Sequence, residues 1–306
     1  MFGFVNLNKP AGFTSHDCIA KLRRLLNTRK IGHGGTLDPA ATGVLPIAVG
    51  KATRLLQFLP TSKAYRATIR LGIATTTDDL EGDIIKQVEK INLTQTQIEA
   101  ALSTFIGTID QVPPIYSAIK KDGRKLYNLA RQGKEIEIEA REVVIEQIKL
   151  LNIVYEQYFE VEVEVNCGAG TYIRAIARDL GEQLGVGGTL AKLVRTKSCQ
   201  LFLDDSLTFA ELEDRLNKQT FELIEPTLLL NLDTVTLAEA DAQKWCQGQL
   251  VDLDRAINCS RESKFIPEQY FVTYTTDRTF LGISILYERL EVLKLKPKIV
   301  LAQLEK

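Results

Sequence analysis

The segment Tyr158–Val165 constrains the fold more than any other stretch, because phenylalanine and valine alternate in it with glutamate almost perfectly. A period of two separates an apolar face from a polar face only in a β-strand. Residues 64–72 alternate in the same way, with apolar residues from Tyr65 to Leu71 on one face and Arg66 and Arg70 on the other. Both segments therefore predict strands that bury one face of a sheet.

Helices and further strands interleave with these two segments without a regular βα repeat. We expect a short strand over residues 4–8, further strands within 135–166 and another over 190–203. Capping-box pairs predict helices that begin after Thr14 and after Thr94, and a glycine turn precedes a helix over 171–184. Two short helical segments are expected within 208–230. This order predicts an α+β fold with a mixed, largely antiparallel sheet.

The length of 306 residues suits one large domain and one small one. We expect a boundary near residues 232–237, which divides the chain into a domain of residues 1–235 and a C-terminal module of residues 236–306. The module should hold a helix at about 238–247 and several short strands. Within the larger domain, residues 111–134 read as a basic flap after Pro113–Pro114, with a short helix near residues 126–131.

Cysteine and histidine content argues against disulfides and metals. The five cysteines are scattered and contain no CxxC pair, which is typical of reduced thiols, and two histidines offer little for a zinc site. The N-terminus lacks the basic and apolar regions of a signal peptide, and no apolar run reaches membrane-spanning length. We therefore expect a cytoplasmic protein without a metal.

Charge is unevenly distributed along a chain whose formal net charge is only −1. Residues 1–70 hold 11 lysines and arginines against 2 acids, residues 111–134 hold 6 against 1, and residues 168–198 hold 5 against 2. Such segments can form a positive face with affinity for phosphates. Solvated helix faces are the alternative explanation of the same pattern.

Residues Gly32–Pro39, with the sequence GHGGTLDP, form the first candidate site. The glycines indicate a tightly shaped backbone that another group approaches closely. Asp38 is one of two acids in the first 70 residues, and its basic surroundings favour the ionised form that a carboxylate nucleophile needs. A plain Asp-Pro turn is the alternative explanation, and residue types alone favour it.

Residues Cys167–Arg174, with the sequence CGAGTYIR, form the second candidate site. A glycine turn lies here between a strand and a helix, as in a dinucleotide-binding fingerprint, but Ile173 stands in place of the third glycine. Arg174 falls in the first helical turn, where the helix dipole disfavours a cation. An arginine there indicates a specific anionic partner, either a functional group or a structural glutamate.

Tyr65 is the third candidate, as a ring on which an exposed base could stack, with an ordinary core tyrosine as the alternative. Residues 43–51 end in Gly-Lys but lack the spacing and the Ser/Thr of a P-loop.

Taken together, these motifs resemble the bacterial T-loop pseudouridine synthases, the TruB family. The resemblance begins at NKPAGFTSHD, is strongest at GHGGTLDPAATGVLP, and continues through AYRATIRLG, TTTDDLEGD, PPIYSAIKKDGRKLYNLAR, CGAGTYIRAIARDLG and LAKLVRTKSC. These blocks occur in the family's order between about residues 4 and 200. Gly34, Gly168 and Ala175 depart from the family pattern but remain small.

The resemblance implies a role for each matching residue. Asp38 corresponds to the catalytic aspartate, Tyr65 to the tyrosine that packs on the target base, and Arg174 to the arginine that pairs with the aspartate. Substrate binding is expected from the remaining matched residues: His33, Leu193, Gly35, Thr36, Tyr172 and Lys9. Of these, Lys9 belongs to a motif that, with Pro10, mainly gives structural support.

The resemblance also implies the reaction and the partners. It implies isomerisation of a flipped-out T-loop uridine of tRNA, at position 55, by an aspartate nucleophile and without a cofactor. It implies contact with the tRNA T arm, no guide RNA, no membrane, a monomer and a PUA-like C-terminal module. The alternatives are a catalytically silent tRNA-binding protein or RNA chaperone, a guide-RNA-dependent synthase, and a nucleotide-binding metabolic enzyme.

Overall fold

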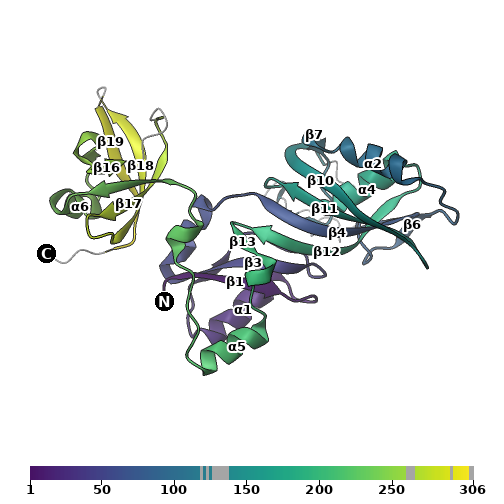
Figure 1. The fold of residues 1–306 in the computed structure, drawn as a ribbon, viewed down its shortest axis with the longest axis horizontal. Coiled ribbons are helices and arrows are strands. Elements are labelled where there is room, and N and C mark those ends of the chain that lie inside the picture. Colours follow the sequence, from purple (N-terminus) through teal and green to yellow (C-terminus); the bar gives the residue numbers. More distant parts are fainter. Residues whose placement is uncertain (118–119, 122–123, 126–137, 260–265, 290–291, 303–306) are drawn as a thin grey trace.

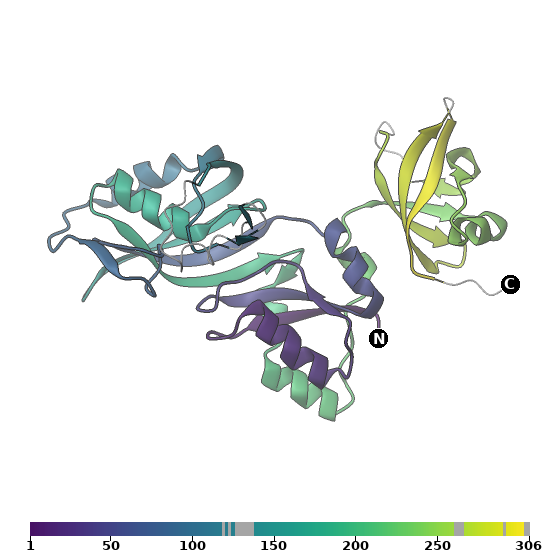
Figure 2. The same ribbon diagram turned by 180° about the vertical axis from the view of Figure 1, so that it is seen from behind.

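Two β-sheets organise the protein (Figures 1 and 2) in a computed structural model that describes residues 1–117, 120–121, 124–125, 138–259, 266–289 and 292–302. The N-terminal part contains a nine-stranded sheet, and the C-terminal end contains a six-stranded sheet. In the large sheet β3 and β12 run parallel, whereas the other described pairs run antiparallel. The predicted α+β class with a mixed, largely antiparallel sheet is confirmed.

The large sheet follows the order β1-β3-β12-β4-β11-β10-β7, with β2 beside β3 and β13 beside β12. Its strands are β1 (Gly3–Lys9), β2 (Ile31–His33), β3 (Thr42–Val49), β4 (Lys63–Leu71), β7 (Gly107–Gln111), β10 (Arg141–Tyr155), β11 (Phe159–Cys167), β12 (Gly188–Ser198) and β13 (Leu201–Phe202). Two hairpins lie outside it: β5 (Ile73–Thr75) with β6 (Ile84–Gln87), and β8 (Lys120–Lys121) with β9 (Arg124–Lys125). The helical elements of this part are α1 (Ser15–Leu25), η1 (Gly50–Phe58), α2 (Gln95–Ser103), α4 (Ile173–Gln183), η2 (Leu203–Asp205), α5 (Phe209–Asn217) and η3 (Pro226–Leu229).

The two alternating segments lie next to each other as β4 and β11, at the centre of the sheet. Their apolar faces are buried, as the period of two predicts. On the other face, two glutamates of β11 lie opposite the two arginines of β4, in the pairs Glu160–Arg70 and Glu164–Arg66. Arg70 donates to Glu160 at 2.8 and 2.9 Å. The basic face of β4 is therefore largely matched by neighbouring acidic residues, and each such pair contributes about 0.2–1 kcal/mol.

Helices α2 and α4 cover the buried face of these central strands (Figure 1), where a core cluster includes Ile69, Val161, Leu102, Ile176 and Leu180. Both predicted capping boxes are present, at Thr94 with Gln97 for α2 and at Thr14 with Asp17 for α1. Helices α1 and α5 pack against β1 and β3 in a separate cluster. Strand β3 is buried almost throughout, which explains its continuous apolar sequence.

The six strands of the C-terminal module lie in the order β15-β19-β18-β17-β14-β16. Its elements are β14 (Asp233–Leu237), α6 (Glu239–Cys246), β15 (Val251–Asp252), η4 (Leu253–Arg255), β16 (Asn258–Cys259), β17 (Tyr270–Thr275), β18 (Phe280–Arg289) and β19 (Val292–Val300). Strand β14 lies within the expected boundary region of residues 232–237, and it pairs with β17 over its whole length. It therefore belongs to the small sheet, and the division into domains at residues 235 and 236 stays a prediction.

The module packs on η1 through a shared apolar cluster that includes Leu55, Val272 and Ile299. Lys51 and Arg54 of η1 also donate to main-chain carbonyls of residues 301 and 300, at 2.9 and 2.8 Å. The short helix expected near residues 126–131 lies outside the described residues. Within the described ranges, we find no helix with the length and apolar character needed to cross a membrane.

Candidate active site

Asp38 lies in the loop that connects β2 to β3, and both of its neighbours in the chain are anchored. The buried hydroxyl of Ser15, at the start of α1, accepts from the Leu37 N–H at 3.0 Å and lies 3.3 Å from the Leu37 carbonyl. On the other side, Lys9 Nζ donates to the Pro39 carbonyl at 3.1 Å. The capping box orients α1, and α1 in turn holds the residue that precedes Asp38.

Lys9 supports this loop from beneath and is not among the residues that line the cavity described below. Its side chain is completely buried, and Nζ donates to the carbonyls of Pro10, Phe13 and Pro39. These three hydrogen bonds use all three donors of an ammonium group. Burial also lowers the pKa of Lys9. These contacts agree with the structural role that its motif implies, and a part for Lys9 in substrate binding stays a prediction.

Arg174 is the centre of the polar network, at the first turn of α4. Its Nε lies 3.0 Å from Asp38 Oδ2, so Asp38 is the anionic partner that we expected for Arg174. Its other nitrogens donate to the carbonyls of Thr77 and Tyr116 at 3.2 and 3.0 Å, and Asp79 Oδ2 lies 3.7 Å away. Since Arg174 is 5% exposed and Asp38 is partly exposed, a fixed cation holds a carboxylate that faces solvent.

Arg195 is a buried residue of the site that the sequence analysis missed. It is completely buried on β12, and its guanidinium donates to the carbonyls of Val44, Thr36 and Gly35 at 2.6, 3.3 and 3.1 Å. The arginine therefore fixes the backbone just ahead of Asp38. It lies two residues after Leu193 on the same predicted strand and within the block LAKLVRTKSC that resembles the family, and these were the signals that could have identified it.

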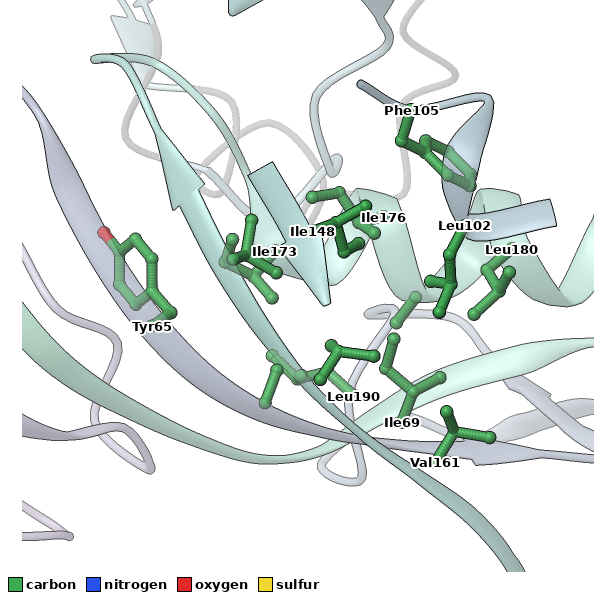
Figure 3. Packing of buried hydrophobic residues seen from close by; sticks show 14 of the residues in the cluster. Tyr65, Ile69, Leu102, Phe105, Ile148, Val161, Ile173, Ile176, Leu180 and Leu190 are labelled. Atoms are coloured by element: carbon green, nitrogen blue, oxygen red, sulfur yellow. The ribbon is translucent and has the colours of Figure 1, made fainter. Parts of the chain in front are cut away.

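Tyr65 lies opposite Arg195 in the register of β4 and β12. The ring is 7% exposed and occupies the end of the core cluster, with its hydroxyl directed away from the aliphatic side chains (Figure 3). Burial raises the pKa of Tyr65, and the charge and hydrogen bond of Arg195 oppose that effect. Tyr65 thus remains a neutral phenol whose ring is held in place from two sides.

A cavity of about 270 Å³ brings most of the predicted residues together. Seven of the nine line it: Gly35, Thr36, Asp38, Tyr65, Tyr172, Arg174 and Leu193. Gly168 and Gly170 of the glycine turn also line it, which gives that turn a role in shaping this cavity. Lys63 lines the cavity as well and was not predicted.

His33 does not line the cavity but lies behind its loop. Its Nδ1 accepts from the Gly35 N–H at 3.3 Å, and its ring lies 5.7 Å from the ring of His16 in an edge-on arrangement. Burial, then His16 and Arg195, lower the pKa of His33. A neutral imidazole is consistent with its acceptor role toward Gly35.

Tyr172 owes its position to a side chain from a different strand. Gln111, at the end of β7, accepts from the Tyr172 N–H at 2.8 Å and donates to the Tyr172 carbonyl at 3.2 Å. This double contact fixes the residue that caps α4 and directly precedes Ile173 and Arg174. Burial raises the pKa of Tyr172.

A search of the described residues finds no group of three or more His, Cys, Asp or Glu side chains that could hold a metal ion. The expectation that the reaction needs no cofactor stays a prediction.

The model for the TruB family pseudouridylate synthase N-terminal domain matches residues 23–173, and the model for the tRNA pseudouridylate synthase B C-terminal domain matches residues 174–237. A protein of Gloeothece citriformis named tRNA pseudouridine synthase B is 55% identical over 93% of this chain and 91% of its own. One of Acaryochloris marina with the same name is 48% identical over 98% and 99%. A solved Cbf5-Nop10-Gar1 complex has a chain with a TM-score of 0.73 and 26% identity, covering 98% of this chain and 84% of that one.

Proposed function

Because the chain belongs to the TruB family of pseudouridylate synthases, we propose that it converts the T-loop uridine at position 55 of tRNA to pseudouridine. The chain is thus an isomerase that makes pseudouridine in tRNA. The observation that carries the choice of site is the Asp38–Arg174 pair at 3.0 Å, on the wall of a cavity that Tyr65 and Leu193 also line.

The reaction breaks the bond between N1 and C1′, turns the uracil, and joins C5 to C1′. A proton leaves C5 and another is gained at N1, so no atoms are added overall and no electrons are exchanged. Asp38 acts as the nucleophile that holds the reactive intermediate between these two bonding steps. Arg174 positions the carboxylate at the cavity, and Ser15, Lys9 and Arg195 fix the backbone around it.

The target uridine must leave its stacked position to enter this cavity. Tyr65 and Leu193 offer the base an aromatic and an aliphatic surface, and stacking on an aromatic ring contributes about 1–3 kcal/mol per base. Tyr172 lines the same space beside Arg174. The remaining surface of the T arm is held by shape and by contacts to phosphates and 2′-hydroxyls, as is usual for RNA.

Several further features belong to this proposal. The enzyme binds the T arm as a monomer, selects its uridine without a guide RNA, and acts in the cytoplasm. Its C-terminal module, of the PUA-like kind, contributes a second RNA-binding surface. Because phosphate contacts dominate such complexes, binding should weaken strongly as salt increases.

Tritium release from C5 tests the proposal directly. Unmodified tRNA transcripts carrying tritium at uracil C5 would be incubated with the purified protein, with the Asp38→Asn variant, and with a second transcript whose T-loop uridine is replaced by cytidine. We expect release that requires both Asp38 and that uridine. A folded protein that binds tRNA but releases no tritium would refute the enzyme and leave the catalytically silent tRNA-binding protein.

A further inference from the structure

Lys63, at the start of β4, is a cation at the cavity that has no role in the reaction proposed above. Lys63 lines the cavity and is partly buried, and its Nζ donates to the Thr61 carbonyl at 2.9 Å. Within the described part of the chain, no carboxylate lies within 4.0 Å of that nitrogen. An ammonium group has three donors, so two remain for a ligand.

Arg195 makes this wall of the cavity more positive. Its guanidinium is bound by main-chain carbonyls, which leave its full charge uncompensated by any described carboxylate. Burial, followed by the charge of Arg195, lowers the pKa of Lys63. Two cations close together in a partly buried wall favour the binding of an anion.

Gly35 keeps the space in front of both cations open. A Cβ atom on this residue would lie 3.5 Å from Lys63 Cε and 3.6 Å from Arg195 Nη1. The backbone there has a φ of +148°, a conformation that other residues rarely adopt. The absence of a side chain at this point allows a bulky group to approach the ammonium of Lys63.

Strand geometry relates Lys63 to Tyr65. Residues two apart in a strand point to the same face and are separated by about 6.6 Å. Both side chains line the same cavity, so a nucleotide whose base packs on Tyr65 would bring its backbone toward Lys63. Asp38 brings a negative charge to the same cavity, and this charge is already paired with Arg174.

We propose that Lys63 binds a phosphodiester adjoining the flipped uridine, so that β4 holds one nucleotide by both its base and its phosphate. This inference rests on the proposed function, because it requires a flipped nucleotide in the cavity. It assigns a phosphodiester subsite to the part of the cavity wall formed by Lys63, with the Arg195 guanidinium buried behind it, separate from the carboxylate that performs the chemistry.

The test measures equilibrium binding of a T-arm RNA as a function of salt. Binding would be measured in the Asp38→Asn background so that the RNA is not turned over. Lys63→Met keeps the aliphatic stem and removes the charge, and Lys63→Arg keeps the charge. The matched control is Lys218→Met, since Lys218 is an exposed lysine at the C-cap of α5 that pairs with Asp214.

Loss of one phosphate contact should weaken binding about 10- to 100-fold at low salt. It should also reduce the slope of log K against log salt by about 0.7–0.9. Lys63→Arg should retain most of the slope, and Lys218→Met should change neither quantity. Equal slopes for Lys63→Met and Lys218→Met would overturn the proposal.

Neutral methylphosphonates at the linkages 5′ and 3′ of the target uridine provide a second test that needs no change at Lys63. We expect one of the two to weaken binding when Lys63 is present, and to have less than about a two-fold effect when it is replaced by methionine. Effects that simply add for both linkages would refute the contact. Tritium release by the unaltered protein is measured separately, so a failure of the proposed reaction is distinguishable from a failure of this subsite.

Discussion

Ser15→Ala is a small change whose effect can be worked out from the hydrogen bonds of one hydroxyl group. The substitution removes one buried oxygen atom, which accepts from the Leu37 N–H at 3.0 Å. A buried donor left without a partner costs about 1–3 kcal/mol. We therefore expect the free energy of unfolding to fall by about that amount, which lowers the melting temperature of a domain this size by roughly 2–12 °C.

The same change should reach the chemistry, because Leu37 directly precedes Asp38. A displacement of the reacting group by about 1 Å can lower turnover by about 100-fold. We expect turnover of tritium-labelled tRNA to fall by about 10- to 100-fold, while the affinity for tRNA changes little. Most of the contacts that would bind the RNA are not altered.

Calorimetry, hydrogen exchange of the Leu37 amide and tritium release together form the assay. The control is Ser103→Ala, whose exposed hydroxyl donates to the Ala100 carbonyl within α2 and should matter by less than about 0.5 kcal/mol. If Ser15→Ala leaves the exchange rate of the Leu37 amide and the turnover unchanged, then Ser15 does not hold the loop and the reasoning is wrong.

Three further outcomes are expected. Arg174→Lys should lower turnover by about 100-fold or more with little change in tRNA affinity. One ammonium group cannot replace the separate guanidinium contacts to Asp38 and to two carbonyls. Measuring kcat and the tRNA dissociation constant of the variant checks this. Burial raises the pKa of the Cys18 thiol to about 11. The protonated thiol therefore contributes its full stabilisation below about pH 9, and this stabilisation is lost as pH rises from there toward 11. In urea titrations of Cys18→Ala, the free energy of unfolding should depend less on pH over that range. Gly43→Ala should destabilise far more than Gly12→Ala in thermal unfolding, because both have positive φ but only at Gly43 would the new Cβ meet the backbone of β12, at 2.3 Å.

Local sequence determined the secondary structure of the central elements. The alternation in residues 64–72 and 158–165 produced β4 and β11 because side chains on a strand point to opposite faces in turn. The capping boxes at Thr14 and Thr94 set the starts of α1 and α2, since the hydrogen bonds involved join residues three apart. These interactions are short in sequence and therefore visible in it.

The motifs also identified most of the residues that line the cavity, including Asp38, Tyr65 and Arg174. What they could not provide was the pairing of charges between distant segments. The excess of basic residues in 1–70 suggested a positive face for phosphates, but the register of β4 with β11 places Glu160 beside Arg70. Strand neighbours are decided by tertiary packing, and so is the net charge of a face.

Sequence by itself thus determined the strands and the helix starts, and its motifs singled out Asp38 as the candidate for the reacting carboxylate. Only the tertiary structure decided which side chains support that carboxylate. It showed Lys9 as a buried support of the loop, revealed Arg195 beneath that loop, and placed Lys63 in the lining of the cavity. The physical reason is that burial and hydrogen-bond partners depend on contacts between segments 30 to 160 residues apart, whereas periodicity and capping depend on neighbours within one turn or one strand.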